Sequence, residues 1–362
     1  MAFNLEKLLA DVFAPQRADV VTIMYDLPHG DIKDNEEWKA RREMAESWWR
    51  AIVEISKRRG FVVNPIVTYD ATGSHNSDMP EYGLCGGKSI RLEDIIKNST
   101  IIISMPQFSA SAPLIGFAKK YERLRVASMP LVTQSMEETG LSADHRQIAA
   151  ICAKLAPLFE RANAIEVAFS TGHTCSFDIS DKQLAFQDNG LLHPNVSDYT
   201  LRMRNLPSGE VCVCPNEADD SLTAGEIPAV FDDETIVFIV KNNQIIDVKG
   251  DGPSAEKMRQ RFDQEPALRN IAEVAIGCND KAAVTGNVLE DEKAGFHWAY
   301  GRSDHLGGKV GPAAFSSPDR VYHKDIVYAK GNPIVCQRLD FLFPDGARKT
   351  AIVEGVLSLG DE

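Results

Sequence analysis

The sequence predicts two domains: an α/β domain with a doubly wound, mainly parallel sheet, then an α+β domain with a largely antiparallel sheet. The first observation is the length of 362 residues, because a chain this long seldom builds a single hydrophobic core. The second is a change of rhythm, from alternating strand and helix patterns to strands and hairpins. The third is a composition typical of a globular protein, with 44% apolar and 25% charged residues. We expect the domains to cover residues 1–162 and 163–362.

The first half alternates buried-strand patterns with apolar residues at helical spacing. A short amphipathic helix is expected at the N-terminus. Further strands are expected over residues 18–25, 61–68 and 100–104, and helices over residues 38–59, 92–97 and 144–162. Strand and helix in turn are typical of a parallel sheet with helices on its faces.

The second half contains strands that alternate in polarity. Residues 234–249 read as a hairpin that turns at Asn242-Asn243, and a helix is expected over residues 254–273. Two later strands are expected near residues 296–301 and 320–328. This order predicts the α+β domain.

Charge and composition exclude several classes of protein. The net charge is −13 without a cluster of Lys and Arg, which argues against a nucleic-acid surface. We find no run of about 18 apolar residues that could span a membrane, and the N-terminus is acidic where a signal peptide is basic. Seven cysteines without regular spacing indicate free thiols. We therefore expect a cytoplasmic protein that binds neither nucleic acid nor membrane.

The first half carries no convincing nucleotide motif. Residues 83–89 resemble a phosphate-binding loop, but Tyr82 stands where that motif needs its first glycine. No G-x-G-x-x-G follows the first strand. We expect no dinucleotide cofactor.

Histidines and carboxylates gather in the second half. In the strand 320–328, His323 and Asp325 share one face about 7 Å apart, which suits convergence on one metal ion. His297 occupies the face opposite an aromatic row, and Glu292 precedes it by five residues. Each residue alone has an ordinary explanation, since His323 and Asp325 could also form an exposed polar pair.

Two earlier carboxylates join this series. Glu210 begins a strand after a turn, and Glu273 is expected at the end of a helix beside an apolar segment. A carboxylate among Ile, Ala and Val is costly to bury without a partner, and a metal would be one.

Four short blocks, in order, resemble the M29 metallopeptidases, the aminopeptidase T and aminopeptidase S group. The blocks are Pro207-Ser-Gly-Glu210, Ala272-Glu-Val-Ala-Ile-Gly-Cys-Asn279, Glu292-Lys-Ala-Gly-Phe-His297 and His323-Lys-Asp325. The resemblance implies an α/β N-terminal domain, a C-terminal domain with two divalent ions (zinc, cobalt or manganese), and a homodimer. It also implies six metal ligands: Glu210, Glu273, Glu292, His297, His323 and Asp325.

One departure weakens the peptidase interpretation. The tyrosine that the family carries a few residues after its motif histidine is missing, and Asp304 or His305 stands near that place. The related ring-opening 2,5-dihydroxypyridine dioxygenases hold one Fe(II) with two His and one Asp. They keep the equivalents of His323 and Asp325 and have a His where this chain has Glu273.

The main hypothesis is a metal-dependent hydrolase, most simply an aminopeptidase that acts on short peptides through a water activated by two metals. Glu292 would accept a proton, and His305 or Arg302 would stabilise the oxyanion. The alternative is a mononuclear non-haem Fe(II) dioxygenase that opens a hydroxylated pyridine-type ring, with His297, His323 and Asp325 as its ligands. A third possibility is a binding protein with a degenerate site. No motif identifies the small-molecule or peptide substrate.

Overall fold

The computed structural model describes residues 3–181 and 184–359. These residues form two compact units, each built from several segments. Unit 1 comprises Met1–Ala149, Asp188–Ser208 and Asp280–Ala283, and unit 2 comprises Ala150–Gln187, Gly209–Asn279 and Val284–Glu362. The domain limits 1–162 and 163–362 stay a prediction.

Unit 1 contains one mixed sheet with the strand order β11-β7-β6-β1-β3-β4-β5, in which β2 also pairs with β1. Strands β11, β7, β6, β1 and β3 pair in parallel, and β3, β4 and β5 pair antiparallel. The strands are β1 (Val20–Leu27), β2 (Val62–Val63), β3 (Val67–Asp70), β4 (Tyr82–Cys85), β5 (Lys88–Arg91), β6 (Ile101–Ser104), β7 (Arg125–Ser128) and β11 (Met203–Asn205). The helices are α1 (Leu5–Val12), α2 (Glu36–Arg59), α3 (Leu92–Asn98), α4 (Ser111–Lys120) and the start of α5 (His145–Arg161).

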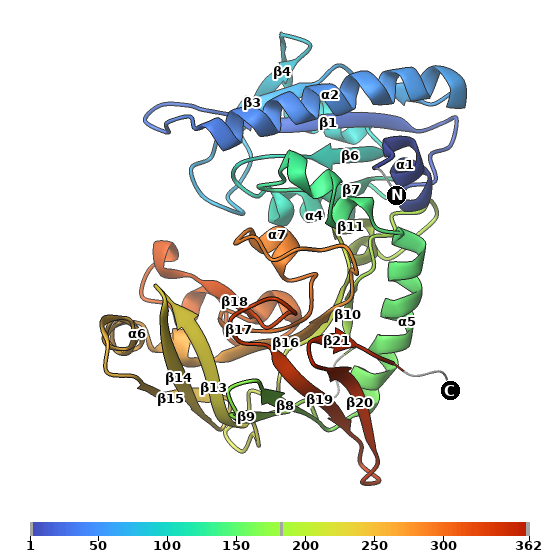
Figure 1. Ribbon diagram of the computed structural model, residues 1–362. Helices are drawn as coiled ribbons and strands as arrows, with labels where there is room; N and C mark the ends of the chain where they lie inside the picture. Colours follow the sequence, from blue (N-terminus) through green and yellow to red (C-terminus); the bar gives the residue numbers. More distant parts are fainter. Residues whose placement is uncertain (1–2, 182–183, 360–362) are drawn as a thin grey trace. The chain divides into compact units, whose positions relative to one another are not determined.

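The sequence explains the core of unit 1. Short apolar strands place Met24, Val67 and Ile102 in one buried cluster, to which α3 and α4 add Leu92 and Leu114. Helix α2 runs along β1 (Figure 1). The helix begins at an Asn35 side-chain cap and ends at Gly60, whose φ of 87° favours glycine.

Unit 2 contains two sheets where one had been expected. The first, with the order β10-β12-β16-β17-β18, is antiparallel from β12 to β18, and the second has the antiparallel order β15-β14-β13-β9-β8-β19-β20-β21. The first sheet consists of β10 (Phe186–Asp188), β12 (Glu210–Val213), β16 (Ile271–Gly277), β17 (Phe296–Gly301) and β18 (His323–Val327). The second consists of β8 (Ala164–Phe169), β9 (Thr174–Asp178), β13 (Ala224–Phe231), β14 (Glu234–Lys241), β15 (Gln244–Lys249), β19 (Cys336–Leu342), β20 (Arg348–Val353) and β21 (Val356–Leu357). Helix α6 (Pro253–Gln264) packs on β14 and β15 (Figure 1), and α7 (Val288–Asp291) precedes β17.

Aromatic side chains join the two sheets of unit 2. Trp298 of β17 packs edge-on against Phe238 of β14, with ring centroids 5.7 Å apart. Its indole nitrogen donates to the hydroxyl of Tyr328 (3.0 Å), which in turn donates to the carbonyl of Pro228 in β13 (2.8 Å). One face of β17 therefore packs in the core between the two sheets, and the alternate residues point to the opposite face.

The main departure from the sequence prediction is Glu273. The predicted helix over residues 254–273 ends at Gln264, and Glu273 lies in the middle of strand β16 instead. The physical reason is pairing with distant segments: β16 lies between β12 and β17 in the sheet, and all seven of its residues are buried there.

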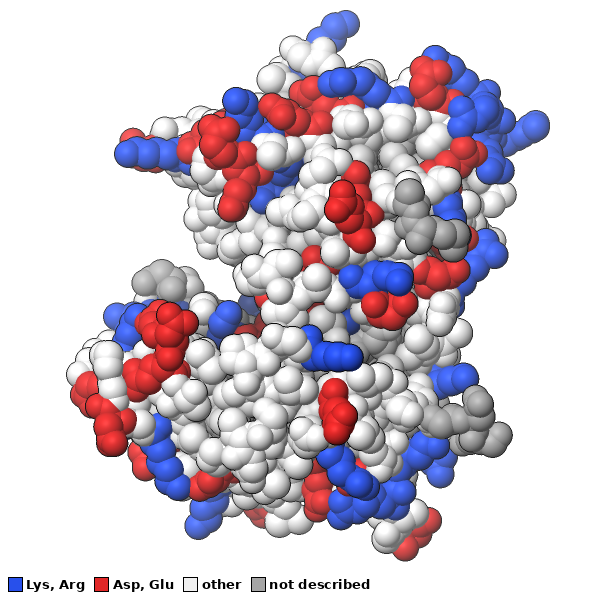
Figure 2. Space-filling model, in the orientation of Figure 1, with Lys and Arg blue, Asp and Glu red and all other residues white. Residues whose placement is uncertain are grey.

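The surface carries both signs of charge. Figure 2 shows acidic and basic side chains interspersed over the visible face of each unit. Among the residues that the structure describes, no helix combines the length and the apolar character needed to cross a bilayer.

Candidate metal centre

The candidate site lies on the face of the first unit 2 sheet that is opposite the aromatic core. Strand pairing aligns Glu273 of β16 with Ala299 of β17, and Ala299 with Asp325 of β18. The three residues thus form one row across the sheet. Because the middle residue has only a methyl group, the two carboxylates can converge above it.

Two histidines lie on either side of this row. His297 lies on β17 two residues before Ala299, and His323 lies on β18 two residues before Asp325. The Nδ1 atom of His297 is 3.2 Å from the carbonyl oxygen of Gly295, and that of His323 is 2.7 Å from the carbonyl oxygen of Arg302. Since these carbonyls can only accept, both Nδ1 atoms carry protons and both Nε2 atoms face the site.

The Nε2 atoms face carboxylate oxygens. Nε2 of His323 lies 3.0 Å from Glu273 and 3.4 Å from Asp325, and Nε2 of His297 lies 3.5 Å from Glu210 and 3.7 Å from Glu273. Within the described residues, there are two groups of three side chains whose potential metal-binding atoms lie within 4.8 Å of one another. The first group consists of Glu210, Glu273 and His297, and the second consists of Glu273, His323 and Asp325. Glu273 belongs to both.

The donor set fits a divalent cation. Two polar atoms in the first group, Oε2 of Glu210 and Nε2 of His297, are buried without a hydrogen-bond partner. Buried polar atoms are normally satisfied, so an unsatisfied pair beside further carboxylates requires an explanation. Imidazole nitrogen with carboxylate oxygen is a common donor set for zinc, manganese and iron.

The electrostatics of the cluster point the same way. Burial alone would lower the pKa of the two histidines, yet the adjacent carboxylates raise the pKa of His297 and of His323 well above the ordinary value. Burial likewise opposes the charged form of Glu273, but its contacts with both histidines hold the pKa of that carboxyl well below its usual range. A bound cation would take the place of those imidazole protons.

Lys293 is the functional candidate that sequence reasoning missed. Its side chain is completely buried, and its Nζ lies 2.6 Å from Oε1 of Glu210 and 2.7 Å from Oε1 of Glu292. Glu292, a predicted ligand and proton acceptor, lies outside both donor groups, and its pKa is raised to about 8, chiefly by burial. The one signal in the sequence that could have identified Lys293 is its position directly after Glu292.

A close backbone approach fixes this lysine. The segment that carries Lys293 packs against Gly277, where a Cβ atom would lie 2.4 Å from the carbonyl oxygen of Glu292. The amide of Gly277 donates to the carbonyl of Gly295 (2.9 Å), and that of Asn279 to the carbonyl of Lys293 (3.0 Å). Only glycine fits at the end of β16.

The predicted catalytic residue His305 lies beside the site. Its ring stands nearly perpendicular to that of His323, with the centroids 4.8 Å apart. Partial removal of the ring from water, followed by the charge of His323, lowers the pKa of His305 to about 4. Its side chain is 42% exposed, so a neutral imidazole lies at the open side of the cluster.

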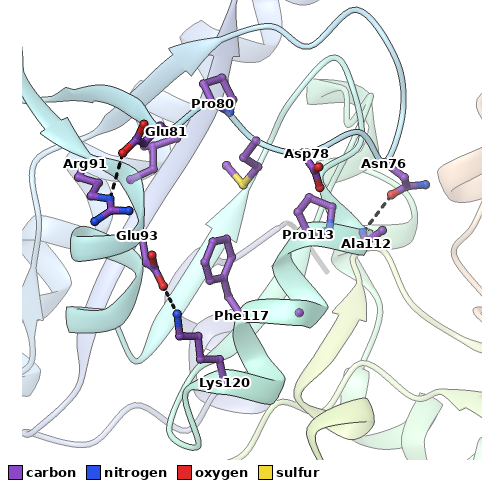
Figure 3. A pocket seen from close by; sticks show the side chains of 13 residues that line it. Asn76, Asp78, Pro80, Glu81, Arg91, Glu93, Ala112, Pro113, Phe117 and Lys120 are labelled. Carbon is purple, nitrogen blue, oxygen red and sulfur yellow. Dashed lines mark hydrogen bonds and ion pairs between the residues drawn. The ribbon is translucent and has the colours of Figure 1, made fainter.

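Unit 1 contains a cavity of about 590 Å³ with a different character (Figure 3). Its two basic side chains are already paired, Arg91 with Glu81 (3.5 Å) and Lys120 with Glu93. Apolar groups such as Pro113 and Phe117 line another part of the cavity wall. It has no surplus of charge comparable with that around Glu273.

Comparison with known proteins supports the fold. No known protein family and no curated protein matches the sequence. Among solved structures, the chain is similar to the 2,5-dihydroxypyridine dioxygenase from Pseudomonas putida KT2440. The identity is 16%, the TM-score is 0.64, and the match covers 99% of this chain and 97% of that one. The likeness shows a shared fold and agrees with the second of the two resemblances, whereas the M29 resemblance receives no support.

Proposed function

We propose that this protein is a metal-dependent enzyme whose centre is built around Glu273, His323 and Asp325. The observation that carries this proposal is the row of Glu273, Ala299 and Asp325 across β16, β17 and β18, whose two carboxylates face an imidazole nitrogen of His323. The reaction that we favour is ring-opening oxygenation of a small hydroxylated pyridine-type ring, because the fold is similar to that of such a dioxygenase over almost the whole chain.

The residues of the chain have distinct parts in this proposal. A bound iron(II) would supply the one-electron chemistry with dioxygen that side chains cannot provide. The Arg302 carbonyl orients His323 by accepting from its Nδ1. His305, neutral because its pKa is lowered to about 4, would accept a hydrogen bond from a ring hydroxyl.

A second candidate is a two-metal hydrolase, such as an aminopeptidase. It is favoured by one specific observation, the membership of Glu273 in both donor groups. A carboxylate shared by two groups is the arrangement in which two ions activate a water. In that case Glu292 would be the proton acceptor and His305 the group that stabilises the oxyanion.

Activity assays on metal-loaded protein separate the candidates. Protein loaded with iron(II) under anaerobic conditions should consume oxygen when dihydroxypyridines are added, and His323→Ala should lower the rate at least about 100-fold. His173→Ala, at a partly exposed histidine paired with Glu226, is the matched control and should keep full activity. Hydrolysis of aminoacyl amides by zinc, cobalt or manganese protein, without oxygen uptake by the iron form, would instead select the hydrolase. Failure to bind any of these metals would refute both.

A further inference from the structure

The loop that carries His305 is closed by its own backbone. We call residues 303–310, which begin two residues after the end of β17, the His305 loop. The Ser303 amide donates to the carbonyl of Val310 (2.9 Å), and the Gly308 amide donates to the carbonyl of Ser303 (3.1 Å). Both hydrogen bonds lie within the loop, so they fix its shape but do not attach it to the sheet.

One carboxylate makes that attachment. Glu217 lies in the segment that follows β12. Its Oε1 accepts from the hydroxyl of Ser303 (2.6 Å) and from the side-chain amide of Asn270 (2.6 Å), and its Oε2 accepts from the backbone amide of Lys309. The carboxylate therefore binds both ends of the His305 loop and, through Asn270, the residue that precedes β16.

Asn270 is a firm support for this contact. The residue is only 1% exposed, its Nδ2 also donates to the carbonyl of Gly301 (3.0 Å), and its Oδ1 accepts from Asn243 (3.1 Å). Both polar atoms of the side chain thus have partners in the sheet region. Glu217 is anchored there and not to a second loop.

Packing holds the His305 loop on the same segment. Gly308 lies so close to it that a Cβ atom would be 2.2 Å from Oγ of Ser303 and 2.7 Å from Sγ of Cys214, which is buried. Cys214 precedes Glu217 by three residues. The loop therefore meets the segment 214–217 twice, by packing at Gly308 and by hydrogen bonds at Glu217.

The place of the loop determines the place of the His305 ring. That ring contacts His323 with centroids 4.8 Å apart, but its side chain is 42% exposed, so packing alone holds it weakly. Arg302 is held differently, because its amide donates to the carbonyl of Tyr322 at the start of β18 (2.9 Å). Release of the loop at Glu217 should thus displace His305 and leave the metal-binding side chains in place.

We propose that Glu217 is a positioning residue that holds the His305 loop, and with it the His305 ring, beside the metal centre. The inference rests on the proposed function, in which His305 accepts a hydrogen bond from a ring hydroxyl of the substrate. A carboxylate suits this role because it offers only acceptors to the three donors, and its hydrogen bonds are stronger than those between neutral groups. The amide of Glu217→Gln would turn a donor toward one of those donors.

The first test is hydrogen–deuterium exchange of metal-free protein, followed by mass spectrometry. In Glu217→Gln the amides of the His305 loop should exchange at least about 10-fold faster than in wild-type protein, with β16 and β17 unchanged. Asp220→Asn, at an exposed acid three residues further along the same segment, is the matched control and should exchange as wild type.

The second test is calorimetric titration of manganese(II)-loaded protein with 2,5-dihydroxypyridine under anaerobic conditions. Glu217→Gln and His305→Ala should each raise the Kd about 5- to 10-fold, as expected for the loss of one hydrogen bond. The double variant should bind no more weakly than His305→Ala, because Glu217 acts through that ring. The affinity for manganese(II) itself should stay as in wild type.

The outcomes separate the inference from the proposed function. Unchanged exchange in a folded Glu217→Gln, additive losses in the double variant, or a loss of manganese(II) affinity would overturn the inference and leave the metal centre standing. Failure of every form to bind manganese(II) would overturn the proposed function instead. Should Glu217→Gln fail to fold, Ser303→Ala removes one of the three donors, and unchanged exchange of the loop in that variant would contradict the role of Glu217.

Discussion

Two buried ionic regions of this molecule are built on opposite plans. In unit 1, Asp19 and Arg125 form a closed pair 2.8 Å apart. The carboxylate of Asp19 also accepts from Thr100 and from the Gln16 amide, and the guanidinium donates to two backbone carbonyls. In unit 2, four carboxylates share one lysine and two imidazoles, and two buried polar atoms of this cluster, Oε2 of Glu210 and Nε2 of His297, have no hydrogen-bond partner.

Buried charge by itself is therefore not a functional signal. The Asp19–Arg125 pair is electrically balanced and needs nothing beyond the protein, as expected of a structural ion pair. The unit 2 cluster has more acids than bases and is stable only with added protons or a cation. Imbalance is the feature that distinguishes the candidate site.

The largest effect is expected from opening the balanced pair. Asp19→Asn should lower the free energy of unfolding by about 3 kcal/mol, because it leaves a buried guanidinium without its counter-ion. Chemical denaturation would measure this loss, and metal affinity should not change. Glu54→Gln, at an exposed pair with Lys57, is the control and should cost less than about 0.5 kcal/mol. A neutral Asp19→Asn would contradict the structural role of the pair.

The next effect concerns the residue shared by both donor groups. Glu273→Gln keeps the shape of the side chain but removes its charge, so the affinity for manganese(II) should fall by at least about 100-fold. Isothermal titration calorimetry would measure the affinity. Glu226→Gln, an exposed acid in the same unit, should leave it unchanged. Equal affinities in the two variants would place the metal elsewhere.

A smaller loss should follow from filling the gap in the row. Ala299→Val puts two methyl groups between Glu273 and Asp325, and we expect metal affinity to fall about 10-fold at a stability cost of about 1 to 3 kcal/mol. Ala351→Val, at a buried alanine in the other sheet, should show a similar stability cost without the loss of affinity. If both variants bind metal equally well, the convergence over Ala299 is not what forms the site.

The smallest effect is a gain in stability. The pKa of Glu292 is raised from 4.5 to about 8, so in metal-free protein the folded state keeps a proton that the unfolded state loses between these values. Stability therefore falls as pH rises from 4.5 to about 8. Glu292→Gln removes this dependence and should stabilise metal-free protein by about 1 kcal/mol at neutral pH, with less gain at pH 5. Thermal melts at neutral pH and at pH 5 would measure these differences. A loss of stability in Glu292→Gln at neutral pH would contradict the expectation.

Much of the fold could be predicted from local pattern. The alternation from Phe296 to Tyr300 predicted an aromatic face and an opposite face with His297, and the structure has both. The hairpin at Asn242-Asn243 and the α/β rhythm of the first half are also present. These features depend on neighbours in the chain, which a single sequence records.

What could not be predicted depends on pairing between distant segments. Glu273 is expected from the sequence at the end of a helix, but it lies within residues 271–277, which are apolar at nearly every position, a pattern that does not distinguish a helix from a fully buried strand. The burial of Lys293 has no local signal, because one of its partners, Glu210, is 83 residues away in the sequence. The separation into two sheets likewise follows from contacts such as Phe238 with Trp298.

Anomalous X-ray diffraction from crystals loaded with manganese(II) would show directly whether the unbalanced cluster is a metal centre. We expect one anomalous peak per chain, bounded by Glu273, His323 and Asp325, that disappears in Glu273→Gln. The absence of a peak there, or a peak only at other residues, would contradict this expectation.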